Sequence, residues 1–315
     1  MTSLRNPLDR WTTAPEPSVD LKFEIQEEML RRGSDLLRTR HSVILGDSRA
    51  VLDGIEPGGV HLVVTSPPYW NLKEYEGEVA DAQLGHIDDR REFLDSLNEI
   101  WERCFAALAP GGRLCIVVGD VCRSRREHGR HVVEPLHAYL QVECQRLGFD
   151  PLSPIIWHKI ANMKTEVGGN GATLGKPYEP NAIIKSDIEF ILMFRKPGGY
   201  RRPTIEQRAL SLIGKADHQA WFRQIWGDVT GEVQRGHPAP YPVEIPRRLI
   251  GMFSFVGDTV LDPFLGTGTT CLAAAQMHRN SIGVEVEPRY FGMARSRLSS
   301  TLSASFEFTE SSGAA

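Results

Sequence analysis

The sequence predicts an α/β fold built on a mostly parallel sheet. Two apolar stretches, 60–64 and 260–261, each lead into a turn whose residues suit the binding of a ligand. A third, 281–284, follows the second after a helical stretch and ends in the acidic Glu285. Strands that alternate with helices pair in parallel, and such sheets bind ligands at the carboxyl ends of their strands. The three stretches therefore predict one shared ligand site.

Length and composition are compatible with one large domain. At 315 residues the chain can hold an α/β domain with an inserted lobe. The net charge of −4 does not indicate a nucleic-acid-binding protein, although a binding groove needs only a local basic surface. The five cysteines form no CxxC motif, so we expect neither a disulfide framework nor a metal site. Because no signal peptide or long apolar span is visible, we expect a soluble, intracellular protein.

The first forty residues are interpreted as an N-terminal arm and helix (1–40). Residues 1–20 are rich in Pro, Thr and charge, which is typical of a loose arm. Apolar residues recur at helical spacing over 21–38, which predicts an amphipathic helix. The helix would cover the core or form a dimer contact, and the sequence leaves both open.

A strand over 41–46 comes next and ends in a Gly-Asp pair. Asp47 suits the N-cap of a short helix that contains Ala50. It also suits a ligand contact at the end of the strand, and both interpretations stand at this point.

The stretch 63–70, VVTSPPYW, predicts a buried strand that ends in a rigid polar turn. Pro67 and Pro68 fix their own φ angles and lack an N–H, and Pro68 also holds Pro67 extended. The result is a stiff edge that offers carbonyl oxygens and the Ser66 hydroxyl beside the ring of Tyr69. Such an edge suits a flat heterocycle with an exocyclic amino group. On its own, however, a PPY motif is more typical of a surface turn.

The middle and end of the chain alternate between regular and irregular stretches. Apolar periodicity predicts helices at 91–108, 132–147, 240–253 and 289–298, and strands at 114–120, 155–159 and 188–194. Periodicity is missing from 71–87, 162–180 and 198–229. Long irregular segments inside a compact fold are usually functional or disordered. The Ser-rich tail, 301–315, is expected to be disordered.

A second turn, within 260–270 (VLDPFLGTGTT), predicts the kind of ligand. Gly266 and Gly268 allow the backbone to approach a ligand and point N–H groups at it from a helix start. A phosphate-binding loop would carry a Lys after its glycines, and a dinucleotide loop would carry Gly or Ala where Cys271 stands. S-adenosylmethionine has no phosphate and needs a tight glycine turn, and Glu285 is placed to hold its ribose. It fits best.

With TSPPYW at 65–70, HPAPYP at 237–242 and DPFLGTGTT at 262–270, the chain resembles the S-adenosylmethionine-dependent amino-methyltransferases that act on DNA. The order, catalytic motif first and cofactor loop last, is similar to their β class, which is circularly permuted. The resemblance covers roughly residues 40–300. It implies a Rossmann-like methyltransferase fold over 41–300 with an inserted target-recognition region. We expect that region at 198–229, or alternatively at 160–182.

The resemblance also implies roles for individual residues. The catalytic residues would be Ser66, Pro67, Pro68 and Tyr69. The cofactor would be bound by Asp47, Thr65, His237, Pro238, Asp262, Pro263, Phe264, Gly266, Gly268, Thr269 and Glu285. Basic residues would contact DNA, namely Arg123, Arg125, Arg126, Lys159, Arg201 and Arg202. A solvated loop explains the densest basic cluster, at 123–131, equally well.

The chemistry follows from these assignments. If the Ser66 hydroxyl and the Pro67 carbonyl accept the two amine hydrogens, the nitrogen lone pair can turn towards the sulfonium methyl for direct transfer. The target base must leave the duplex, and stacking on Tyr69 would return about 1–3 kcal/mol of the unstacking cost. Methylation at carbon 5 of cytosine would need a cysteine nucleophile, and no cysteine adjoins the motif. That reaction is excluded.

Several alternatives remain at the level of the sequence. Ser at the first position of the motif is commoner in the cytosine-directed members of the family, which favours N4-cytosine over N6-adenine. A catalytically inactive cofactor-binding DNA regulator and an enzyme acting on protein or RNA are further hypotheses. The expected partner is double-stranded DNA, and the enzyme would act either with a cognate restriction endonuclease or as a solitary methyltransferase. The protein would be a cytoplasmic monomer or homodimer near a bacterial or archaeal nucleoid. The recognition sequence is not determined.

Overall fold

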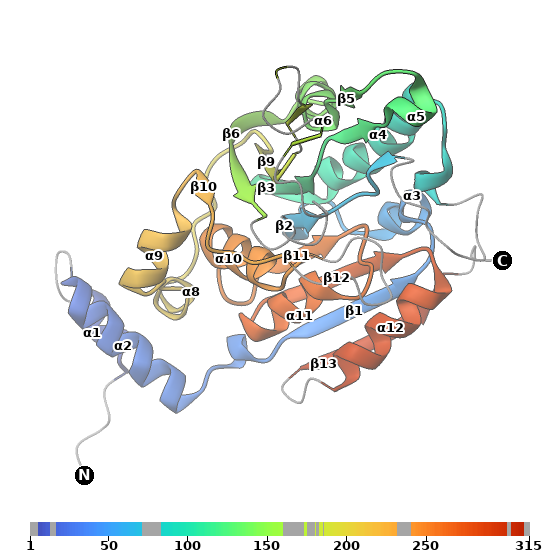
Figure 1. Ribbon diagram of the computed structural model, residues 1–315. Helices are drawn as coiled ribbons and strands as arrows, with labels where there is room; N and C mark the ends of the chain where they lie inside the picture. The colour runs from blue at the N-terminus through green and yellow to red at the C-terminus, as the bar shows by residue number, and fades with distance from the viewer. Residues whose placement is uncertain are drawn as a thin grey trace, which may run out of the picture.

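The computed structural model describes residues 6–12, 17–70, 83–159, 173–174, 180, 183–184, 186–231, 241–300 and 304–311. Nine of the described strands form one sheet in the order β10-β6-β9-β3-β2-β11-β12-β1-β13 (Figure 1). All neighbours in this sheet are parallel except the two pairs made by β9, so the mostly parallel sheet is confirmed. The strands are β1 (Arg40–Leu45), β2 (Val60–Thr65), β3 (Leu108–Val118), β6 (Asp150–His158), β9 (Ile188–Arg195), β10 (Ile225–Trp226), β11 (Thr259–Asp262), β12 (Asn280–Glu285) and β13 (Ser305–Glu310).

Short elements and helices surround the sheet. Two small hairpins pair β4 (Val121–Arg123) with β5 (Val132–Glu134) and β7 (Thr173–Leu174) with β8 (Ile183–Ile184). The helices are α1 (Asp9–Thr12), α2 (Val19–Arg32), α3 (Ser48–Val51), α4 (Arg90–Ala107), α5 (Arg125–His128), α6 (Leu136–Arg146), α8 (Ile205–Leu210), α9 (Lys215–Trp221), α10 (Glu244–Phe253), α11 (Thr269–Gln276) and α12 (Pro288–Ser299). None of the helices in the described ranges combines the length and the apolar character that crossing a membrane requires.

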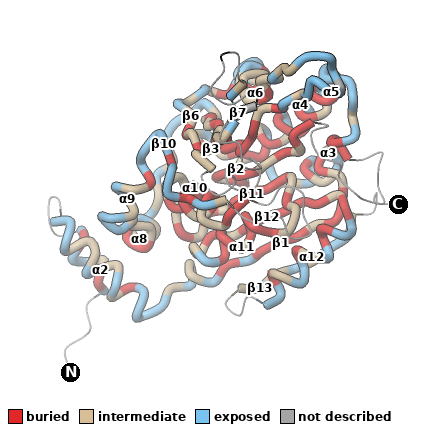
Figure 2. Tube along the Cα trace, viewed as in Figure 1, coloured by how far each residue is buried: buried red, intermediate tan, exposed pale blue. Residues whose placement is uncertain are grey.

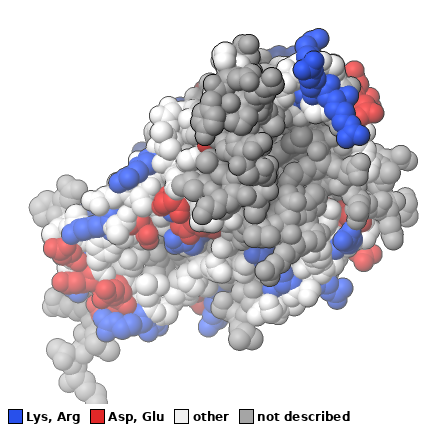
Figure 3. Space-filling model, viewed as in Figure 1, with Lys and Arg blue, Asp and Glu red and all other residues white. Residues whose placement is uncertain are grey.

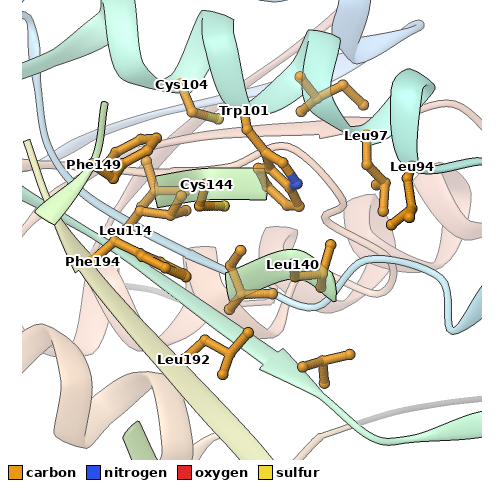
Figure 4. Packing of buried hydrophobic residues seen from close by; sticks show 14 of the residues in the cluster. Leu94, Leu97, Trp101, Cys104, Leu114, Leu140, Cys144, Phe149, Leu192 and Phe194 are labelled. Carbon is orange, nitrogen blue, oxygen red and sulfur yellow. The ribbon is translucent and has the colours of Figure 1, made fainter. Parts of the chain in front are cut away.

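Helices cover both faces of the sheet, so its central strands are apolar on both sides. Along β3, the side chains of Leu114, Ile116 and Val118 pack with α4 and α6, in a core that includes Trp101 (Figure 4). The alternate side chains of β3 pack on the opposite face with residues of α10 and α11. A strand points successive side chains to opposite faces, which explains the unbroken apolar run in the sequence. The buried residues concentrate in these central strands (Figure 2).

The pairing of β2 with β11 brings the two diagnostic motifs together. Leu62 lies opposite Val260 and Val63 opposite Leu261, in parallel register. Because the strands run in the same direction, both end at the same edge of the sheet. The turn after Thr65 and the turn after Asp262 are therefore neighbours in space, although the chain between them includes most of the fold.

The N-terminal part and the segment 198–229 pack against each other. Helix α2 contacts α8, and their apolar side chains form a separate small core with Trp11. The helix predicted over 21–38 ends earlier, because Gly33 follows Arg32 with φ of 79° and a 3₁₀ turn begins at Asp35. The segment 198–229 was expected to be irregular, but it contains α8, α9 and β10. A capping box at the start of α8 is a local signal that the sequence analysis missed.

Two further predictions about regular structure were wrong. Residues 132–134 form strand β5 rather than the start of the helix, which begins at Leu136. The tail that was expected to be disordered contains β13, which pairs in parallel with β1. The alternating Phe306 and Phe308 explain it, since they pack with the core around α12 and the ring of Phe306 stacks on His41 at 4.5 Å.

Candidate active site

A cleft opens at the carboxyl edge of the sheet, where the ends of β2, β11 and β12 meet α4 and α12. Its space is about 750 Å³ including the part open to solvent. Eight of the residues predicted for catalysis or cofactor binding line it: Asp47, Ser66, Pro67, Pro68, Pro263, Phe264, Gly266 and Glu285. The lining also includes nine residues that the sequence analysis did not assign to the site: Ser48, Gln83, Leu84, Gly85, Ile100, Val284, Val286, Glu287 and Tyr290.

A buried carboxylate joins the two strands beneath the cleft. Asp262 is 1% exposed, and its Oδ1 accepts hydrogen bonds from the Thr65 hydroxyl at 2.6 Å and from the Phe264 N–H at 3.0 Å. Its Oδ2 accepts from the Thr270 hydroxyl at 2.6 Å. Burial raises the pKa of Asp262, while these hydrogen bonds and one from Tyr241 oppose the rise. Neither Asp262 nor Thr65 lines the cleft, so the structure shows both as a brace beneath it, and their contact with the cofactor stays a prediction.

The glycine turn is held against Glu285. The Gly266 N–H donates to Glu285 Oε2 at 2.7 Å, and the Glu287 N–H donates to Oε1 at 2.9 Å. Burial raises the pKa of Glu285 to about 7, with these two hydrogen bonds acting in the opposite direction. Gly268 caps α11 with φ of 85°, a left-handed conformation that glycine adopts at least cost. Gly268 and Thr269 lie outside the cleft lining, so their contribution is to the shape of the turn.

The acidic residue Glu287, missed in the sequence, lies at the same end of β12. It is 1% exposed, caps α12 and accepts a hydrogen bond from Gln83 Nε2 at 2.7 Å. A local signal for the helix start was present, because proline is common at the first position of a helix and Pro288 stands there. The contact with Gln83 could not be found from sequence, because it joins residues on distant segments.

Ser66 occupies the boundary between the cleft and the interior. Its hydroxyl is 3.0 Å from the Val117 carbonyl oxygen, to which it donates, and 3.4 Å from the Tyr69 oxygen. With its hydrogen directed inward, the Ser66 oxygen keeps lone pairs that can accept hydrogens from a ligand amine. Pro67 and Pro68 continue the cleft wall.

The two aromatic residues of the motif lie beside Ser66 but do not line the cleft. The Tyr69 side chain is buried, and its hydroxyl donates to Glu189 Oε2 at 3.0 Å. Trp70 has φ of 48°, donates from Nε1 to the Ile87 carbonyl at 2.8 Å, and carries the Arg123 guanidinium over its ring at 4.0 Å. A left-handed conformation costs a non-glycine residue about 1–2 kcal/mol, and these contacts offset it.

Asp47 combines the two roles that the sequence left open. Its Oδ1 accepts from the Arg49 N–H at 2.8 Å, so it caps α3, and its carboxylate forms a salt bridge with the Arg49 guanidinium. It also lines the cleft. The structure therefore shows that Asp47 caps α3, and in this position Asp47 also lies in the wall of the cleft.

The predicted DNA contacts divide between the two edges of the sheet. Arg123 and Lys159 lie beside the motif, and exposed Arg125 and Arg126 are on α5, where basic side chains gather on the surface (Figure 3). Arg201 binds Asp258 with both terminal nitrogens, and Asp258 precedes β11 at the amino edge.

The prediction for Arg201 and its exposed neighbour Arg202 therefore places them at the wrong edge for a contact beside the cleft. The physical reason is the salt bridge itself. A carboxylate that is 1% exposed requires a paired cation, and Arg201 supplies it.

Some predictions fall outside the described residues. These are His237 and Pro238 of the cofactor assignment, residues 71–82 of the irregular stretch after the motif, and nearly all of the alternative recognition region at 160–182.

The cysteines agree with the exclusion of a thiol nucleophile. Cys104, Cys115, Cys144 and Cys271 are buried, and burial raises the pKa of each thiol, to about 12 for Cys115 and Cys271. A nucleophilic cysteine needs a lowered pKa. Exposed Cys122 also has a raised pKa, caused mainly by partial burial.

Comparisons with known proteins agree with the geometry. A sequence model of a family described as DNA methylase (N6_N4_Mtase) matches residues 60–296. The type II methyltransferase M.MjaI of Methanocaldococcus jannaschii is 38% identical over 278 residues, which cover 80% of this chain and 88% of the relative. M.MthZI of Methanothermobacter thermautotrophicus, also a type II methyltransferase, is 34% identical over 291 residues, covering 86% and 80%.

Solved structures show the same similarity. TTHA0409 of Thermus thermophilus, described as a putative DNA modification methylase and solved with S-adenosyl-L-methionine, superposes with a TM-score of 0.72 at 50% identity. The match covers 86% of this chain and 99% of that one. The PvuII DNA methyltransferase, described as cytosine-N4-specific, superposes with a TM-score of 0.59 at 19% identity and covers 82% and 86%, which shows a common fold alone.

Proposed function

The chain belongs to the DNA methylase family as a β-class, S-adenosylmethionine-dependent DNA amino-methyltransferase, and on that premise we propose that it methylates the N4 amine of cytosine. The cytosine would be flipped out of double-stranded DNA at a specific sequence. The observation that supports the choice of an amine is Ser66, whose hydroxyl hydrogen is directed inward to Val117 and whose lone pairs remain for a ligand. The choice of cytosine rests on a serine at this position of the motif.

The residues of the cleft fit the cofactor. Its walls include apolar Phe264 and Ile100, which can pack against a flat base, and Glu285 lies at the end of β12, where its carboxylate can accept from ribose hydroxyls. We propose that Glu285 and Asp47 bind the ribose and adenine parts and that the turn at Gly266 binds the methionine part. Bound there, the cofactor supplies a methyl group on a positively charged sulfur.

The chain's own contribution to the reaction is positioning. We propose that the Ser66 hydroxyl and the Pro67 carbonyl accept the amine hydrogens, which localises the nitrogen lone pair. Pro68 stiffens the turn so that both acceptors keep their separation. Tyr69 would contribute a face for the extruded base beside these acceptors.

Other parts of the assignment remain proposals of the same kind. We propose that Arg123, Arg125 and Arg126 contact DNA phosphates, because Arg123 lies over the ring of Trp70 in the motif and α5 follows it directly. Lys159, which the sequence analysis also assigned to DNA, pairs with the Glu189 carboxylate. We propose that the region 198–229, or alternatively 160–182, reads the target. Within 198–229, β10 runs parallel to β6, so the residues after it lead to the carboxyl edge of the sheet. The enzyme would act as a monomer or homodimer at the nucleoid of a bacterium or archaeon, with or without a restriction endonuclease.

Mapping the methylated base tests the function directly. DNA from cells that express the chain should contain N4-methylcytosine in one short sequence context and none in cells that express a Ser66→Ala variant. N6-methyladenine in one context would replace the cytosine assignment with the adenine one. Binding of labelled cofactor with no label transferred to DNA would favour the inactive regulator.

The raised pKa of Glu285 predicts a pH dependence of cofactor binding. Ribose hydroxyls donate to a carboxylate, so binding favours the ionised form, and the pKa of about 7 in the free protein should fall in the complex. Cofactor affinity should therefore rise as pH increases from about 5.5 to about 7.5 and level off above it. Calorimetry should show release of a proton on binding near pH 6.5.

A Glu285→Gln variant is the matched control for this prediction. It keeps the size of the side chain but cannot ionise, so cofactor affinity should be weaker and should no longer change over this pH range. An unchanged pH profile in Glu285→Gln would show that another group causes the dependence.

A further inference from the structure

A buried charged residue lies directly behind the catalytic motif. Glu189 belongs to β9 and is 7% exposed, within the otherwise apolar run IEFILMF. Its Oε2 accepts the hydrogen bond from the Tyr69 hydroxyl at 3.0 Å, and its Oε1 pairs with the Lys159 ammonium group. Lys159 follows β6 and lies over the Trp157 ring at 4.9 Å. Glu189 therefore joins the motif to a fixed cation on a neighbouring strand.

The buried ion pair between Glu189 and Lys159 is weak evidence of a contribution to the stability of the fold. Removing a carboxylate and an ammonium from water costs several kcal/mol each, and replacing such a pair with apolar residues is often neutral or stabilising. The next residue of β9, Phe190, packs against the apolar core and stacks on the His137 ring. The pair of Glu189 and Lys159 is therefore better explained by its hydrogen bond to the Tyr69 hydroxyl.

The backbone at Gly119 leaves room for the contact between Tyr69 and Glu189. Gly119 follows β3, and a Cβ atom there would lie 3.3 Å from Tyr69 Cε2 and 3.3 Å from Glu189 Cγ. Such separations are tighter than most real contacts of a Cβ atom. A glycine at 119 thus allows both the Tyr69 ring and the Glu189 side chain to approach the end of β3 closely.

The hydrogen bonds continue from Glu189 through the Tyr69 hydroxyl to Ser66, the proposed acceptor of the target amine. Because the Tyr69 hydroxyl donates to Glu189, its oxygen is left as an acceptor 3.4 Å from Ser66 Oγ. The Ser66 hydrogen then has two acceptors on the inner side, the Tyr69 oxygen and the Val117 carbonyl. Both directions leave the lone pairs of Ser66 turned away from the interior.

We propose that Glu189 and Lys159 are positioning residues that orient Tyr69 and, through its hydroxyl, the acceptor face of Ser66. This inference rests on the proposed function, because it assigns to Glu189 an effect on the methyl-transfer step through Tyr69. Glu189 itself does not touch the base or the cofactor in this arrangement.

A double-mutant cycle tests it. Tyr69→Phe removes the hydroxyl, and Glu189→Gln removes the charge at nearly constant volume. Each should lower the single-turnover rate of methyl transfer to DNA by about 10-fold or more, the loss expected when a hydrogen bond to a charged group is removed. If Glu189 acts through Tyr69, the double variant should be no slower than the slower single variant, and the cofactor dissociation constant should stay within about twofold of wild type in all three.

Two further variants separate positioning from general stability. Lys159→Arg keeps a cation beside Glu189 and should retain most of the rate. Asp150→Asn breaks the ion pair with Arg195, which joins the same two strands, β6 and β9, at their other end. Its rate should equal that of wild type, and melting curves of all variants would show whether they fold.

The outcomes separate the inference from the function beneath it. Suppose that wild-type protein transfers methyl groups and that the rate losses of Tyr69→Phe and Glu189→Gln multiply in the double variant. This result would overturn the role of Glu189 and leave the proposed function intact. The same holds if Glu189→Gln matches wild type, or if Asp150→Asn is as slow as Glu189→Gln. Wild-type protein that transfers no methyl group to DNA would overturn both.

Discussion

Replacing Ser66 with alanine should lower the rate of methyl transfer by about 10²–10³-fold, the usual loss when one preorganised hydrogen-bonding group is removed from a reacting centre. The target amine would lose the acceptor that localises its lone pair. The cofactor dissociation constant should change by less than about twofold, because the proposed cofactor contacts are the turn at Gly266 and Glu285, and Ser66 is not among them. Single-turnover transfer of labelled methyl to DNA and calorimetric titration of the cofactor measure the two effects separately.

A serine at a distance provides the control. Ser186 is exposed, and its hydroxyl donates to the Ile188 carbonyl at 3.3 Å just before β9. Ser186→Ala should transfer methyl groups at the wild-type rate. If Ser66→Ala also retained the wild-type rate, the Ser66 hydroxyl would not be the acceptor, and the proposed mechanism would fail.

Replacing Asp262 with alanine should destabilise the protein by about 3–5 kcal/mol, measured by urea unfolding. The change removes the acceptor of the Thr65 and Thr270 hydroxyls and of the Phe264 N–H. Thr270 keeps the Val64 carbonyl at 3.4 Å as a weaker acceptor, and the cost of burying the carboxylate is lost as well. The unpaired Thr65 hydroxyl, the unpaired Phe264 N–H and the cavity at position 262 outweigh these gains. Cofactor affinity should fall as well, because the ends of β2 and β11 would no longer be joined.

An Asp262→Asn variant distinguishes the brace from a direct ligand. Asparagine keeps one oxygen for Thr65 and Phe264 and loses the charge, so the cost to stability should be smaller, about 1–2 kcal/mol. Variants that unfold like wild type but bind the cofactor much more weakly would contradict the brace. They would restore the direct contact that the sequence predicted for Asp262.

The local motifs could be interpreted from sequence because their signals are local. The prolines after β2 fix their own φ angles, and the glycines after β11 permit a turn that few other residues adopt. Both effects arise within a few residues, so the pattern predicts the geometry before any packing is known. The same is true of Asp47, whose position before a helix predicts its cap.

The errors arise where distant residues decide the outcome. Arg201 is a residue type that often contacts DNA, yet in the structure it forms a salt bridge with Asp258 at the amino edge of the sheet. The Ser-rich tail has the composition of a disordered segment. In the structure, however, Phe306 stacks on the His41 ring and the tail adds strand β13 to the sheet. In each case a tertiary partner outweighed the composition of the segment.

By itself, the sequence determined the α/β class, the identity of the two turns and the kind of chemistry they support, because backbone restriction and side-chain type act over short distances. Only the tertiary structure decided that Asp262 would brace β2 against β11, that Glu189 would hold Tyr69, and which basic residues share an edge with the cleft. These depend on strand order and register, since a buried charge or hydroxyl must find its partner wherever the folded chain places one.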